Sequence, residues 1–163
     1  MRRGLVLMAV VALQFATPVI AGHVAGRAGV IDGDTIEIRS QRIRISGVDA
    51  PEAGQVCYSP SGRQWRCGQR AALMLADHIG TGPVSCRTEG QDRYGRWLAR
   101  CTAHRQDLGE WLVRNGWAVP YFDHNHAYAE AQRAARASRA GIWAGQFTLP
   151  KDWRKLQRNY NAN

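Results

Sequence analysis

The sequence lacks three features that would point to other classes of protein. It has no internal repeat and no low-complexity run, which argues against a repeat array or a fibrous chain. It has no C-x-x-C pair, and the nearest His-x-His, His124 and His126, lies far from the cysteines, so a zinc site is disfavoured. The apolar run at residues 5–16 falls short of the roughly 18 to 20 residues that span a bilayer.

The N-terminus has the order of a secretory signal peptide. Arg2 and Arg3 precede the apolar run, and small residues up to Ala21 follow it. We therefore expect residues 1–21 to be a signal peptide that is removed, leaving a periplasmic or secreted protein with no stable membrane association. The alternative, a membrane anchor, would need a longer apolar run.

The four cysteines all lie beyond the predicted cleavage site, and an even number in an exported chain predicts two disulfides. Three pairings are possible. The segment between Cys86 and Cys101 has the pattern of two strands around a turn at Arg93-Tyr94, so these two cysteines should face each other across a hairpin. The remaining pair is then Cys57 with Cys67.

Length and charge limit the organisation of the chain and its partners. The 163 residues suit one compact domain, which we place at residues 22–150 and expect to be monomeric. The polar, basic residues 151–163 are expected to form a loosely held tail. A formal net charge of +9 favours a polyanionic partner but does not distinguish DNA, RNA, acidic glycans and anionic lipid.

Residue spacing predicts the elements of an α+β domain. Between residues 29 and 48 apolar side chains alternate in steps of two, with turns at Asp32-Gly33 and Ser40-Gln41. Helical spacing follows at residues 69–79, 107–116 and 126–140, and glycines stand near the three ends. Strands followed by helices indicate a small antiparallel sheet or barrel with packed helices.

Three short stretches concentrate charged side chains, namely Asp32-Gly33-Asp34-Thr35, residues 44–52 and Asp92-Arg93-Tyr94-Gly95-Arg96. Each stretch alone could be an ordinary turn. Together they supply hard oxygen ligands, a spare carboxylate and two guanidiniums. Phosphodiester hydrolysis needs such a set, because cations must stabilise charge on the phosphate and a base must activate water.

In this order, D-G-D-T, R-x-x-x-V-D-x-P-E and D-x-Y-G-R resemble the staphylococcal nuclease family, and the likeness extends from about Gly29 to Trp143. The resemblance implies a mainly β, α+β fold, namely a five-stranded OB-type antiparallel barrel with three helices. It also implies calcium-dependent cleavage of DNA and RNA that leaves 3′-phosphates.

The resemblance assigns a metal site. Calcium would be bound by the carboxylates of Asp34 and Asp49 and by the carbonyl of Ala50, where the best-known family member has threonine. Because a backbone carbonyl is the ligand at that position, alanine should serve. Asp32 and Thr35 would not bind the metal themselves but would support the residues that do.

The resemblance also assigns the catalytic and substrate-binding residues. Glu52 would be the general base, and Arg44 and Arg96 would bind the phosphate. Four further residues are expected to contact the substrate: Arg93, Tyr94, Tyr121 and Phe122. Two alternatives stay open: a related domain that binds nucleic acid with little catalysis, and a basic protein that adheres to polyanions without any convergent carboxylates.

Overall fold

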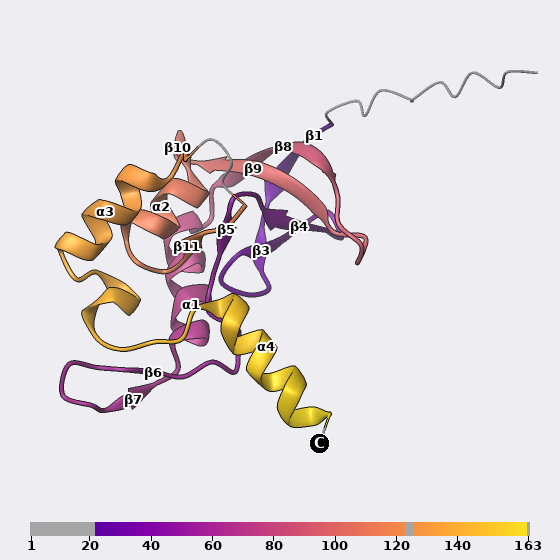
Figure 1. The fold of residues 1–163 in the computed structure, drawn as a ribbon. Coiled ribbons are helices and arrows are strands. Elements are labelled where there is room, and N and C mark those ends of the chain that lie inside the picture. The colour runs from indigo at the N-terminus through magenta and orange to yellow at the C-terminus, as the bar shows by residue number, and fades with distance from the viewer. Residues whose placement is uncertain (1–21, 123–125, 163) are drawn as a thin grey trace, which may run out of the picture.

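The computed structural model describes residues 22–122 and 126–162, so the predicted signal peptide lies outside the described residues (Figure 1). One sheet of seven strands forms the body of the described chain, in the order β1-β8-β9-β4-β3-β2, with β10 paired to β9. The strands are β1 (His23–Arg27), β2 (Gly29–Val30), β3 (Thr35–Ile38), β4 (Gln41–Ile45), β8 (Pro83–Gln91), β9 (Trp97–Ala103) and β10 (Gln106–Asp107). Short strands β5 (Val48–Asp49) and β11 (Val119–Pro120) form a separate pair, as do β6 (Cys57–Tyr58) and β7 (Gln64–Trp65).

The sheet curls as an OB-type barrel does. Strands β8 and β9 form a long, curved hairpin (Figure 1). Strand β1 packs closely on β3: a methyl group added at Gly26 of β1 would lie 3.1 Å from Cγ2 of Ile38 of β3. The α+β, OB-like prediction is therefore confirmed, with two differences. The main sheet has seven strands instead of five, and the pairing of β4 with β9 is parallel, whereas we expected only antiparallel pairs.

The core lies between the curled sheet and two helices. Ile36 and Ile43 pair across β3 and β4, and both are fully buried. Leu75 of α1 and Leu108 and Leu112 of α2 are buried in the same cluster. Burying each such side chain contributes about 1.5 to 3 kcal/mol, so the alternating pattern read from the sequence is what fixes the sheet against the helices.

The three predicted helices are present. Helix α1 (Cys67–Ile79) ends at Gly80, as expected, and α2 (Leu108–Arg114) is capped by Asp107, whose side chain accepts a hydrogen bond from the Glu110 amide at 2.8 Å. Helix α3 (Ala129–Ala137) is shorter than predicted, because its C-terminal cap is Ser138 and Gly141 instead begins the 3-10 turn η1 (Gly141–Ala144). Within the described residues, no helix is long and apolar enough to cross a membrane.

Both predicted disulfides are confirmed. Cys86 and Cys101 face each other in the register of β8 and β9, and their sulfurs are 2.11 Å apart. Cys57 and Cys67 are joined at 2.03 Å, which ties the β6–β7 loop to the start of α1.

Within the expected tail at residues 151–163, the described residues form helix α4 (Pro150–Asn161), which the sequence reading did not predict. Pro150 occupies the first turn, where its missing N–H and fixed φ favour a helix start, and no glycine interrupts the following residues. Figure 1 shows α4 projecting from the body of the protein. Only Pro150 is buried in this helix.

The start of α1 positions the segment that carries Glu52. A methyl group added at Gly68 would lie 1.8 Å from the carbonyl oxygen of Glu52, so the helix and this loop touch through backbone alone.

We expect Gly68→Ala to lower the free energy of unfolding by about 1 to 3 kcal/mol in a urea titration, through overpacking. Gly29→Ala is the control, because nothing lies within 4 Å of a methyl group there. Equal stability of the two variants would contradict this packing.

Candidate active site

Asp34 stands at the end of a tight turn and is almost fully buried. Asp32 holds the turn by accepting a hydrogen bond from the Asp34 amide at 3.0 Å. The Thr35 hydroxyl donates to Oδ1 of Asp34 at 3.1 Å, and the Ala50 amide donates to Oδ2 at 3.1 Å. A methyl group added at Gly33 would lie 2.6 Å from Cβ of Ala50, so only glycine lets this turn approach the loop after β5.

Arg44 joins the two buried carboxylates. It lies on β4 opposite Thr35 of β3, and its side chain points to the end of the sheet where Asp34 and Asp49 meet. Nη1 donates to Oδ1 of Asp34 and Nη2 donates to Oδ1 of Asp49, both at 2.8 Å. One guanidinium therefore bridges a carboxylate from the turn before β3 and one from β5.

The charge on Asp34 is not fully compensated. Burial raises the pKa of Asp34 to about 7; Arg44 opposes this shift, and the nearby carboxylates of Asp32 and Asp49 add to it. Burial alone would lower the pKa of Arg44, but attraction to Asp34 and Asp49 outweighs it and leaves this pKa raised. The cluster thus has an excess of negative charge that a further cation would relieve.

Arg154 of α4 completes this cluster, and sequence reasoning missed it. Nη1 of Arg154 donates to Oε1 of Glu52 at 2.7 Å and to Oδ1 of Asp49 at 2.8 Å, while Nη2 donates to Oδ2 of Asp49 at 2.9 Å. These hydrogen bonds, those to Asp49 foremost, raise the pKa of Arg154 despite its partial burial. The helix start at Pro150 was a readable signal, but no motif marked Arg154.

The hairpin tip between β8 and β9 carries Arg96. Its guanidinium is paired with Asp92, with Nε and Nη2 at 2.9 and 2.7 Å from Oδ2. Burial alone would raise the pKa of Asp92, but hydrogen bonds from Arg96 and from the Tyr94 amide outweigh it and lower this pKa. The guanidinium carbons of Arg93 and Arg96 lie 4.9 and 5.6 Å from the centre of the exposed Tyr94 ring.

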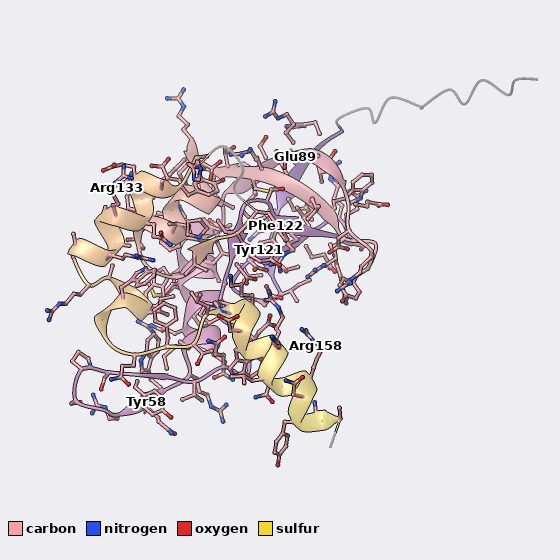
Figure 2. The ribbon with its side chains drawn as sticks, in the orientation of Figure 1. Tyr58, Glu89, Tyr121, Phe122, Arg133 and Arg158 are labelled. Atoms are coloured by element: carbon pink, nitrogen blue, oxygen red, sulfur yellow. A yellow bond between two sulfur atoms is a disulfide. The ribbon has the colours of Figure 1, made fainter. Side chains whose placement is uncertain are left out.

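Two aromatic side chains follow β11. The Tyr121 amide donates to the carbonyl of Gly47 at 2.8 Å, and the Tyr121 and Phe122 rings contact edge to face with centres 4.3 Å apart. Figure 2 shows Tyr121 and Phe122 over the sheet and Arg158 below them on α4. Phe122 is 72% exposed, so its ring is accessible to a ligand.

These elements surround one groove of about 640 Å³. The buried cluster forms its floor through Asp34, Arg44 and Glu52, and Arg154 and Arg158 line the side formed by α4. Its remaining lining includes the four predicted substrate residues and Arg96: Arg93, Tyr94, Arg96, Tyr121 and Phe122. Asp49 and Thr35 do not line the groove; Asp49 lies beneath it, bonded to Arg44 and Arg154, and Thr35 bonds Asp34. The other residues predicted for the site line the groove, although Arg96 is engaged with Asp92 rather than with the buried cluster.

The donor set at the floor fits a calcium ion. Asp34 and Asp49 offer hard carboxylate oxygens, and burial, with a smaller contribution from Asp32 and Asp49, raises the pKa of Asp34. Among the described residues, no three His, Cys, Asp or Glu side chains form a metal cage by themselves. Calcium commonly adds backbone carbonyls and waters to its carboxylate ligands, which is the role predicted for Ala50.

The buried position of Asp34 predicts a dependence of stability on pH. A carboxyl group whose pKa rises from 3.8 to about 7 on folding binds more protons in the folded state, so its contribution to stability falls as pH rises through this window. In chelator at pH 8, we expect Asp34→Asn to unfold a few degrees or more above the unsubstituted protein, and this advantage should shrink at pH 4.

Thermal unfolding at both pH values measures this effect. Asp77→Asn, which removes an exposed carboxylate from α1, controls for the loss of one negative charge. An unchanged or lower melting temperature for Asp34→Asn at pH 8 would contradict the assigned burial cost.

The comparisons with known proteins agree with this geometry. A family described as staphylococcal nuclease homologue matches residues 42–145. The chain is 42% identical over 129 residues to the succinoglycan biosynthesis protein ExoI of Rhizobium meliloti, covering 77% of this chain and 68% of that one. It is 29% identical to an uncharacterized endonuclease of Haemophilus influenzae, covering 79% and 71%, and 28% identical to a micrococcal nuclease of Shigella flexneri, covering 93% and 91%. The chain belongs to the staphylococcal nuclease family.

Proposed function

We propose that the protein is an exported, calcium-dependent nuclease that hydrolyses phosphodiester bonds of DNA and RNA to 3′-phosphate products. One observation carries the proposal: Arg44 bridges Asp34 and the fully buried Asp49, and Asp34 and Arg44 line a groove that also holds Glu52 and Arg96. Nuclease-named relatives support the reaction class. The two disulfides support an oxidising compartment, since such bonds persist outside the cytosol.

The reaction follows from what the side chains can donate and accept. Water attacks the phosphorus, and Glu52 takes its proton. The bond from phosphorus to the 5′-oxygen breaks, and this oxygen takes up a proton from solvent while Glu52 returns its own proton to solvent. The products are a 3′-phosphate on one fragment and a 5′-hydroxyl on the other. Arg44 and Arg96 donate to the phosphate oxygens as negative charge grows on them. Asp34, Asp49 and the carbonyl of Ala50 would hold calcium, which when bound would supply a further positive charge to the site.

The groove walls suit a nucleic-acid strand with unpaired bases. Tyr94 and Phe122 are 68% and 72% exposed and can stack on bases without regard to sequence. Arg93 lies beside Tyr94 at the hairpin tip, where it can contact the backbone. A broad substrate range, covering both DNA and RNA, follows from contacts of this kind.

A catalytically weak nucleic-acid-binding domain is the alternative. A domain that only binds nucleic acid needs cationic side chains that neutralise phosphates. Buried carboxylates beneath the groove would repel the phosphates and weaken such binding. The excess negative charge around Asp34 is useful only where a metal ion bridges protein and phosphate. This cluster therefore favours catalysis over binding alone.

Substitution of the proposed catalytic residues tests the assignment. We expect Glu52→Gln to lower kcat for a single-stranded oligonucleotide by about 10²- to 10⁴-fold, because the attacking water loses its base. Arg96→Ala should lower it by about 10²- to 10³-fold through loss of a preorganised donor. The control for Arg96→Ala is Arg133→Ala on α3. This variant also removes one positive charge, but at a position far from Tyr121, which lines the groove (Figure 2). If both site variants keep full activity, the chemistry has been placed on the wrong residues.

Calcium and salt separate cleavage from binding. We expect excess chelator to abolish cleavage and added calcium to restore it, because the buried carboxylates need a bridging cation. Binding of the same oligonucleotide should weaken steeply as salt rises from about 50 to 200 mM. Salt-sensitive binding by folded, calcium-loaded protein with no product on a gel would favour the binding domain.

A further inference from the structure

Arg154 occupies atoms that the proposed metal site needs. Both oxygens of Asp49 accept hydrogen bonds from its guanidinium, at 2.8 and 2.9 Å, and Oδ1 also accepts one from Arg44. The same Nη1 of Arg154 donates to the proposed general base, Glu52, at 2.7 Å. In this state Asp49 accepts three hydrogen bonds from two arginines, and Glu52 is engaged by one of them.

Charge compensation explains why Arg154 is there. Asp49 is fully buried, and a buried carboxylate without a counter-ion is strongly destabilising. Without Arg154, Arg44 would be the one guanidinium paired with both Asp34 and Asp49. Arg154 therefore gives the pair a second positive charge, which is the charge that a bound cation would otherwise supply.

A metal ion bound to Asp49 would compete with Arg154. The cation would bind the same two carboxylate oxygens to which the two Arg154 nitrogens donate. The two positive charges would also repel each other at short range in a partly buried site. Metal loading and the docking of Arg154 are thus in competition.

Helix α4 is built so that Arg154 can leave. Its attachment to the body is at its first turn, where Pro150 is buried and the adjoining Thr148 carbonyl accepts from Nε2 of Gln55 at 2.7 Å. Beyond that turn, Leu156 and Tyr160 are 58% and 80% exposed, and the helix projects into solvent (Figure 1). A small pivot at the first turn would withdraw Arg154 without disturbing the core.

We infer that Arg154 is a resident counter-ion of Asp49 and Glu52, and that calcium binding displaces it and releases α4 from the site. The inference rests on the proposed calcium-dependent function. Once displaced, Arg154 is free to bind substrate phosphate together with Arg158, which follows it by one helical turn and lines the same groove. Calcium then exposes the general base and frees a cationic helix in one step.

Calcium affinity measured without substrate tests the competition. The rise in melting temperature with calcium concentration gives a dissociation constant for the full mature chain. We expect Arg154→Ala to bind calcium about tenfold or more tightly than the unsubstituted protein, since charge-assisted hydrogen bonds no longer compete. Arg158→Ala is the matched control: it removes the same charge from the same face of α4, where no contact with Asp49 or Glu52 is present, and should change the affinity far less.

Hydrogen exchange of the unsubstituted protein provides a second measurement that needs no variant to fold. Calcium should speed exchange of the amides in residues 150–161 while slowing it around residues 34–49. Slower exchange in α4 with calcium, or equal calcium affinity for Arg154→Ala and Arg158→Ala, would overturn the displacement and leave the proposed nuclease intact. Absence of any calcium effect on all three proteins would overturn both the displacement and the calcium dependence.

Discussion

The burial of two carboxylates, Asp34 and Asp49, is the constraint on which the rest of the site depends. Charges in this position must be paired or hydrogen-bonded, and a single guanidinium cannot neutralise two of them. Arg44 bridges the pair, Arg154 adds a second positive charge, and the amide of Ala50 adds a hydrogen bond. A site that stays short of positive charge is suited to a metal ion, which could in turn bridge the carboxylates to a phosphate.

The fold supplies this arrangement through strand register. On β3 and β4, Ile36 pairs with Ile43 in the core, and the next pair is Thr35 with Arg44. Because neighbouring residues on a strand face opposite sides, a slip of one residue would turn Arg44 into the core and expose an isoleucine. The antiparallel pair of β11 and β5, with Val119 opposite Asp49, places the second carboxylate beside the first. Core packing and site geometry are therefore set by the same hydrogen-bonded ladders.

Much of the site could be predicted from the sequence, because its residues lie in short motifs. Asp34, Arg44, Asp49 and Glu52 fall within 19 consecutive positions, and turns and short strands bring them together. Their roles in metal binding and catalysis remain predictions. The disulfide between Cys86 and Cys101 was predictable for a similar reason, since a hairpin is a local structure.

Contacts between distant segments could not be predicted in this way. Arg154 reaches Asp49 across 105 positions of the chain, from a basic segment whose composition suggested a tail. The parallel pairing of β4 with β9 likewise joins strands separated by α1 and β8, and no local pattern encodes it. In both cases tertiary interactions determine the structure. The buried carboxylates stabilise the position of Arg154, and closure of the curled sheet brings β4 and β9 together.

The most direct test of the account is to identify the product ends formed from a defined single-stranded oligonucleotide by the oxidised mature protein, using mass spectrometry, with Asp49→Asn alongside. We expect 3′-phosphate and 5′-hydroxyl ends in calcium, no products in chelator, and little or no product from Asp49→Asn, because this carboxylate binds Arg44 and would also bind the metal. Cleavage that persists in chelator, or that Asp49→Asn performs at the full rate, would contradict the claim that the buried carboxylates form the catalytic centre.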